Sequence, residues 1–155
     1  MREGADAAAA TAPVHLQPRW LLVVFAGGAF GGLCRFLLSH LGPRDQGSFP
    51  WATFGTNVAG AFALGLLLEV LVRRGADEGS RRTLRLGVGT GVLGAFTTYS
   101  ALAGETVLLV REGAAAVATV YAVLSATAGV LAAGAGITLV SAVHRRRTRV
   151  RRSSE

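Results

Sequence analysis

The stretch Gly94-Ala95-Phe96-Thr97-Thr98-Tyr99-Ser100-Ala101-Leu102 lies in the middle of a long apolar segment, from about residue 84 to residue 110. Glycines crowd the turns before it, and four hydroxyl side chains follow one another within it. Glycine and β-branched threonine are poor residues for a helix interior, so a helix should weaken or break here. A break inside a membrane frees backbone carbonyls, which are tolerated where they are buried, face water or bind a cation. The stretch therefore predicts a broken transmembrane helix with an ion site, and a close-packing face of small residues is the alternative.

The composition of the whole chain is that of a membrane protein. Of its 155 residues, 51% are hydrophobic and only 16% are charged. The 21 glycines fit close packing of helices in lipid. A single cysteine, Cys34, excludes a disulfide within the chain, and the count excludes a four-cysteine metal site.

Four apolar segments are long enough to cross about 30 Å of hydrocarbon as helices. We expect these spans at about 20–41, 51–72, 84–110 and 114–143. They form one membrane domain, residues 20–143, between an N-terminal tail, 1–19, and a basic C-terminal tail, 144–155, both expected to be disordered. The predicted fold class is an all-α membrane protein with four transmembrane helices, of which the third is broken mid-span.

Basic residues are distributed unequally between the two sides of this membrane domain. The N-terminal tail, the 73–85 loop and the C-terminal tail share one side, which carries thirteen of the sixteen basic residues. The other side carries Arg44 and Arg111. The positive-inside rule therefore predicts that both termini are cytoplasmic. The basic tail could also bind lipid headgroups or nucleic acid, and we expect no nucleic-acid partner.

Polar side chains inside the spans are functional candidates because they are costly in hydrocarbon. Arg35 lies deep in the first span, and Asn57 lies among small residues in the second. Tyr121 and Ser125 lie one turn apart on the fourth span and so share a face. The structural alternatives are snorkelling for Arg35, an interhelical hydrogen bond for Asn57 and simple packing for the pair.

The acidic residues of the spans lie near their ends. For Glu69 and Glu105 we expect snorkelling or pairing with a nearby arginine. A proton-coupled cation carrier needs a buried carboxylate, and a cation path needs acidic rings. The interior instead offers hydroxyls, one amide and one guanidinium, which favour a small anion. No nucleophile–base pair, metal cluster or phosphate loop is recognisable, so we expect that the protein is not an enzyme.

Three motifs follow one another on the first three spans: Gly27-Gly28-x-x-Gly31-x-x-x-Arg35, Gly55-Thr56-Asn57-Val58-x-Gly60 and Gly94-x-x-Thr97-Thr98-x-Ser100. In this order and spacing they resemble the Fluc/CrcB family of small fluoride-specific ion channels, over about residues 20–143. The resemblance implies an antiparallel dimer in the cell membrane with two fluoride pores. Its expected function is passive export of fluoride from the cytoplasm, which reduces fluoride toxicity, with fluoride and the lipid bilayer as partners.

The resemblance also implies site residues. A structural sodium ion at the dimer centre would be held by backbone carbonyls of Gly94 and Thr97 from the two subunits. Arg35 and Glu105 would have structural or electrostatic roles. The pore-lining residues implied by the match are Asn57, Thr98, Tyr99, Ser100, Leu102, Tyr121 and Ser125.

The sequence departs from the family pattern after the two threonines. The family usually has Phe-Ser-Thr-Phe there, with the positive edges of the two rings pointing at fluoride. This chain has Tyr99, which keeps a ring and adds a hydroxyl, and Leu102, which offers no ring edge.

Two other functions and two assemblies stay open. A small multidrug-resistance transporter also has four short helices, but it needs a glutamate in the middle of the first span, which has none. A non-conducting subunit of a heteromeric channel would lack the row of polar residues along the pore. Leu102 is a partial loss of this kind. An antiparallel homodimer needs balanced basic residues on the two sides, so the observed bias also favours a heterodimer with an oppositely oriented paralogue.

Overall fold

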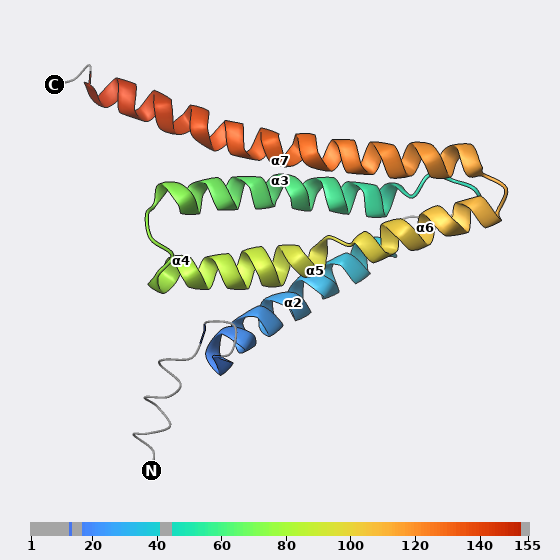
Figure 1. Ribbon diagram of the computed structural model, residues 1–155, viewed down its shortest axis with the longest axis horizontal. Coiled ribbons are helices and arrows are strands. Elements are labelled where there is room, and N and C mark those ends of the chain that lie inside the picture. The colour runs from blue at the N-terminus through green and yellow to red at the C-terminus, as the bar shows by residue number, and fades with distance from the viewer. Residues whose placement is uncertain (1–12, 14–16, 41–44, 153–155) are drawn as a thin grey trace, which may run out of the picture.

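The computed structural model (Figure 1) describes residue 13, residues 17–40 and residues 45–152, with side chains up to residue 146. Within these ranges all regular structure is helical. The helices are α2 (Pro18–Ser39), α3 (Trp51–Arg73), α4 (Gly79–Leu84), η2 (Arg85–Leu93), α5 (Gly94–Phe96), α6 (Tyr99–Arg111) and α7 (Ala115–Arg152). Four helical stretches are long and apolar enough to cross a membrane, the third being Gly79–Arg111. The prediction of an all-α protein with four membrane-spanning helices is confirmed.

The ends of the chain differ from the predicted boundaries. Helix α2 begins at Pro18, inside the predicted tail, because proline is well accommodated in a first helical turn. The expected disorder of residues 1–12 and 14–16 lies outside the described residues. Helix α7 continues to Arg152, so the prediction of a disordered tail is wrong for 144–152. No glycine or proline follows Gly136 to end the helix, and arginine is a good helix former.

The four stretches run up and down beside one another, as Figure 1 shows. Helix α3 packs along α7, and α2 packs along η2 and α5. Glycines make both contacts close: a Cβ atom on Gly65 would overlap the backbone of Ala133 in α7. In the same way, a Cβ atom on Gly27 or Gly31 would overlap the backbone of η2. These small residues let the helix backbones touch, as is usual in membranes.

The third stretch changes its helical form twice. Residues Arg85–Leu93 form a π-helix, and at its end the N–H of Gly94 donates to the carbonyl of Gly89, five residues earlier. The helix then stops after Phe96. Thr97 (φ −80°, ψ 153°) and Thr98 (φ −151°, ψ 121°) are extended, and a helix resumes at Tyr99. This interruption fits the predicted mid-span break, whereas the π-helix was not predicted.

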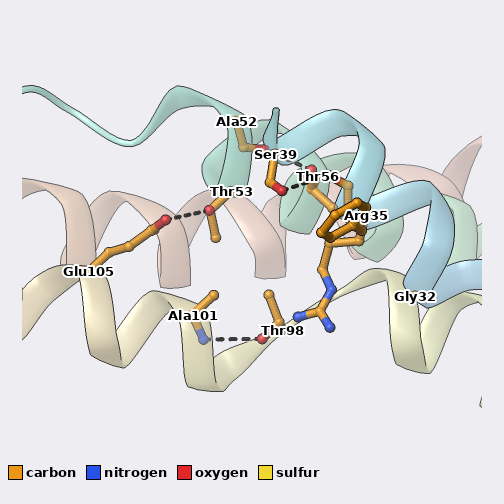
Figure 2. A pocket seen from close by; sticks show the side chains of 10 residues that line it. Gly32, Arg35, Ser39, Ala52, Thr53, Thr56, Thr98, Ala101 and Glu105 are labelled. Atoms are coloured by element: carbon orange, nitrogen blue, oxygen red, sulfur yellow. Dashed lines mark hydrogen bonds between the residues drawn. The ribbon is translucent and has the colours of Figure 1, made fainter. Parts of the chain in front are cut away.

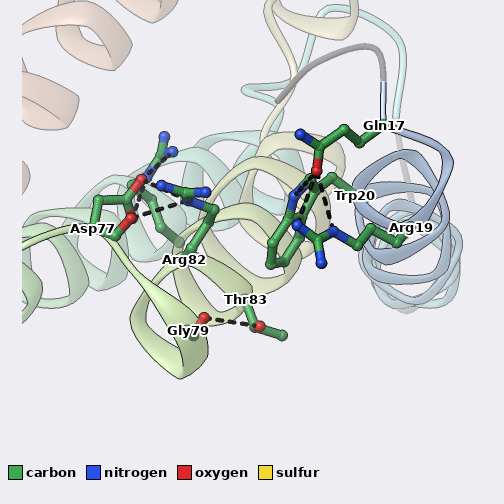
Figure 3. Close-up of polar contacts among 8 residues, drawn as sticks. Gln17, Arg19, Trp20, Asp77, Gly79, Arg82 and Thr83 are labelled. Carbon is green, nitrogen blue, oxygen red and sulfur yellow. Dashed lines mark hydrogen bonds and ion pairs between the residues drawn. The ribbon is translucent and has the colours of Figure 1, made fainter. Parts of the chain in front are cut away.

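The turn between α3 and α4 is held by charged side chains (Figure 3). The carboxylate of Asp77 accepts hydrogen bonds from Arg85 at 3.0 and 2.7 Å and forms an ion pair with Arg82 at 3.6 Å. The hydrogen bonds from Arg85 are the main reason why the pKa of Asp77 lies below its ordinary value. The Arg82 guanidinium also lies 5.9 Å from the ring centre of Trp20, which connects this turn to the start of α2.

Candidate functional site

A pocket of about 230 Å³ lies between α2, α3 and α6, next to the helix break (Figure 2). Three of its lining residues, Arg35, Thr98 and Glu105, were predicted as site residues. The sequence analysis missed three hydroxyls that also line it: Ser39, Thr53 and Thr56. Two of them bond to a carbonyl on their own helix, Ser39 to Phe36 at 2.7 Å and Thr56 to Ala52 at 2.7 Å. Such bonds are common in helices, so these residues give little functional signal in a sequence.

Arg35 is the cation of this pocket. Its side chain is half-buried and points toward Thr98 in Figure 2. Among the described residues, no hydrogen bond or ion pair involves the Arg35 guanidinium. Arg35 lies four residues before Ser39, the last residue of α2, so its side chain is also within reach of the headgroups for snorkelling. A half-buried cation is stabilised by a counter-ion, and an anion in the pocket would supply one.

Asn57 bonds to the broken backbone of the third stretch. Its Oδ1 accepts from the N–H of Thr98 at 2.8 Å, and its Nδ2 donates to the carbonyl of Thr98 at 3.1 Å. The structure thus contains the interhelical hydrogen bond that was the alternative for Asn57. An amide nitrogen carries two N–H groups, so one remains for a further acceptor such as an anion.

The break leaves carbonyls without their helical donors. In a continuous helix the N–H of Thr98 would bond to Gly94, and the N–H of Ala101 would bond to Thr97. Here the first N–H donates to Asn57 and the second to Thr98 Oγ1, at 3.1 Å. Gly94 is exposed on the surface of the chain, where a partner could approach. Carbonyls of this kind are suitable ligands for a hard cation, so the residues present fit the implied sodium site.

Glu105 connects the pocket to α7. Its Oε1 accepts from Thr53 Oγ1 at 2.8 Å, and its Oε2 accepts from the Tyr121 hydroxyl at 2.5 Å. The expected pairing with a nearby arginine is therefore wrong for Glu105, because Arg111 lies on another face of α6. Glu69, in contrast, does bond to Arg73, at 2.6 Å.

Tyr121 and Ser125 share one buried face of α7, as predicted. Tyr121 is fully buried, and its ring packs edge-on against Phe49, with centroids 5.2 Å apart. Ser125 is 6% exposed, and its Oγ atom has no hydrogen-bond partner among the described residues. A buried hydroxyl without a partner costs stability, so it marks a place where an anion or a water molecule would gain a donor.

The side chains just after the break have different surroundings. Tyr99 is 81% exposed and points away from its own chain. The Ser100 hydroxyl lies 3.0 Å from Thr98 Oγ1. Leu102 packs instead against the buried cluster around Leu109 and Tyr121. One chain therefore does not bring Tyr99 and Leu102 together.

Comparison with known proteins agrees with these motifs. Residues 22–137 match the family described as CrcB-like protein, Camphor Resistance (CrcB). The chain belongs to the CrcB family. A relative from Leifsonia xyli subsp. xyli, named fluoride-specific ion channel FluC 2, is 48% identical over 135 residues, which are 87% of this chain and 92% of the relative. A relative from Cutibacterium acnes, named fluoride-specific ion channel FluC 1, is 43% identical over 85% of this chain and 92% of its own.

The CrcB match includes the pocket, the helix break, Tyr121 and Ser125. Both relatives are named as ion channels. Across the part of the chain that the structure describes, no group of three or more His, Cys, Asp or Glu side chains could hold a metal ion. A cation in this CrcB chain would thus depend on oxygen ligands such as the carbonyls at the break.

Proposed function

We propose that this chain is a subunit of a fluoride channel that lets fluoride leave the cytoplasm passively and so reduces fluoride toxicity. The observation that carries the proposal is the Arg35 guanidinium, which faces a pocket lined by hydroxyls and by Glu105 and forms no ion pair among the described residues. The names of the relatives as fluoride-specific channels support the choice of anion.

Fluoride is small and strongly hydrated, so a path through a membrane must replace its water with hydrogen-bond donors. Arg35 attracts the anion to the pocket, and the hydroxyl of Thr98 offers a donor within it. Glu105 orients the Thr53 and Tyr121 hydroxyls through its two bonds. Ser125, one turn beyond Tyr121, supplies a hydroxyl that has no hydrogen-bond partner among the described residues.

Fluoride efflux from liposomes that contain the purified chain tests this function. With the paralogue partner present, we expect efflux well above that of empty liposomes, with chloride retained. Arg35→Gln removes the charge and should slow fluoride efflux, while Arg111→Gln, an exposed arginine at the end of α6, should not. Equal release of chloride and fluoride, or no release from liposomes with this chain and a paralogue together, would contradict the proposal.

The same proposal includes a sodium ion between two subunits, bound by the carbonyls of Gly94 and Thr97. The ion would offset the carbonyl dipoles that the break leaves unpaired. Its removal should loosen the dimer, so the thermal stability of the purified protein should fall when sodium is replaced by N-methylglucamine. Unchanged stability, together with a density map that shows no ion at the break, would contradict the site.

We further propose an antiparallel dimer in the cell membrane, with both termini of this chain in the cytoplasm. The excess of basic residues on one side supports a fixed orientation, and hence an oppositely oriented paralogue as partner. The packing of Leu102 into its own chain supports the same partner, which would complete a working pore. Cysteine labelling of chains expressed alone distinguishes the assemblies, because equal labelling from both sides means dual insertion and a homodimer.

A multidrug-resistance-type transporter is less well supported. Helix α2 has no acidic residue between Pro18 and Ser39, so it lacks the carboxylate that such a transporter needs in its first span. Drug-dependent proton exchange in the same liposomes would reverse this preference.

A further inference from the structure

A groove of about 460 Å³ lies between α3 and α7, toward the basic end of the helix pair. Its floor is apolar and includes Leu66 and Val70 of α3 and Leu139, Val140 and Val143 of α7. Arg73, Arg74 and His144 close its end. Along both helices the lining therefore changes from apolar to basic at the same level.

One of the two arginines is fixed by neighbouring side chains. Glu69 Oε1 accepts from Arg73 Nε at 2.6 Å and from the Ser141 hydroxyl at 2.8 Å, and Arg73 also donates to Ser141 at 2.8 Å. This network joins α3 to α7, and Arg73 belongs both to it and to the lining of the groove. It neutralises the charge of Arg73 with a carboxylate, so Arg73 contributes shape and hydrogen-bond donors rather than net charge.

Arg74 supplies the net charge at this end of the groove. Its side chain is exposed, and no ion pair among the described residues involves it. Glu78 and Arg74 line a separate hollow, and Asp77 pairs with Arg82 and Arg85. Helix α7 continues beyond the groove with Arg145 and Arg146, which add to the positive potential there.

We propose that this groove binds one anionic phospholipid. An acyl chain would lie along the apolar floor, and the phosphate would bind Arg74 beside the remaining N–H groups of Arg73. The order of apolar and basic residues along the helices is that of a lipid from tail to headgroup, and basic pockets between transmembrane helices are typical sites for anionic headgroups. A second copy of this chain would match the groove less well, because it has no acidic end of its own to meet this basic one.

Lipid retention measured by native mass spectrometry tests the site. The purified full-length chain is equilibrated with mixed micelles that contain either phosphatidylglycerol or phosphatidylcholine as the probe. We expect one phosphatidylglycerol to stay bound per chain and phosphatidylcholine to be lost. Arg74→Gln should weaken retention by about fivefold, the effect of one arginine near an anionic headgroup. Val143→Trp, which fills the apolar floor, should weaken it as well.

The control is Arg111→Gln, which removes an exposed arginine at the opposite end of the molecule and should leave retention unchanged. Equal retention of the two lipids, or equal losses in Arg74→Gln and Arg111→Gln, would overturn the proposal. A disulfide between two chains that carry Val143→Cys and Cys34→Ser would also overturn it, since a second copy would then cover the groove. The readout does not involve fluoride, so it is independent of the proposed channel function.

Discussion

The side-chain amide of Asn57 bonds to both the N–H and the carbonyl of Thr98, at 2.8 and 3.1 Å. One side chain of α3 thus replaces the helical hydrogen bonds that the third stretch loses at its break. Because Thr98 also lines the pocket beside Arg35 and caps α6 through its hydroxyl, the same contact positions the pocket and the restart of the helix. Asn57 therefore stabilises the break, in addition to its proposed role as a hydrogen-bond donor in the pore.

Replacing Asn57 by aspartate tests both roles. The variant keeps an acceptor for the N–H of Thr98 and removes the donor to its carbonyl, so two oxygens face each other at a cost of about 1–3 kcal/mol. We expect a lower melting temperature from this cost, and slower fluoride efflux because the new carboxylate repels the anion. The control Thr127→Val changes an exposed hydroxyl that bonds to the Val123 carbonyl, and it should preserve both properties. Parental efflux in Asn57→Asp would refute the pore assignment.

Ser125→Ala should separate stability from transport. Its buried hydroxyl has no partner among the described residues, so its removal should leave the melting temperature unchanged or raise it. If fluoride passes Ser125, the same variant should conduct more slowly. Efflux and thermal unfolding are measured on one preparation. Ser141→Ala is the contrasting variant, because it breaks the bond to Glu69 and should lower stability first. Undiminished efflux in Ser125→Ala would remove Ser125 from the path.

Two glycines of α3 should respond in opposite directions to alanine. A Cβ atom on Gly60 would overlap the Thr97 side chain at the break, whereas a Cβ atom on Gly55 meets nothing within 4 Å. Overpacking costs about 1–3 kcal/mol, so Gly60→Ala should lower the melting temperature and distort the break. Gly55→Ala should be neutral or stabilising, since alanine is the better helix former by about 1 kcal/mol. The same destabilisation in both variants would mean that helix packing at Gly60 is not the cause.

Acid should weaken the turn between α3 and α4. The pKa of Asp77 lies below its ordinary value of 3.8, chiefly because of hydrogen bonds from Arg85. Its contribution to stability is present above that ordinary value and is lost as the pH falls through the lowered one. Asp77→Asn should therefore lose less melting temperature than the parent between about pH 6 and about pH 3. Asp45→Asn, which removes no ion pair of the described residues, should resemble the parent. A parental acid response in Asp77→Asn would contradict this assignment.

The sequence predicted those features that depend on local composition. Apolar length is sufficient to locate four spans, and the run from Gly94 to Ser100 contains the weak helix formers that indicate a break. The sequence could not predict that Glu105 bonds to Thr53 and Tyr121, because those partners lie on two other helices. Thr53 and Thr56 were missed for the same reason: a threonine in a span resembles any β-branched residue until its neighbours are known. The predicted end of the fourth helix was wrong because a segment rich in arginine was interpreted as disordered, although arginine is a good helix former.

The π-helix from Arg85 to Leu93 sets the direction in which the break faces. A π-turn contains one residue more than an α-turn over the same ladder of bonds, so it acts as an insertion within the helix. If this segment wound as an α-helix, the residues after it would rotate by about 100° about the axis for each displaced residue. Thr98 would then turn away from Asn57, and the carbonyls of Gly94 and Thr97 would turn with it. The π-helix thus sets the rotation of the following residues about the axis of the third span. Deleting a single residue from it should misalign the break, while the length and hydropathy of the span stay almost unchanged.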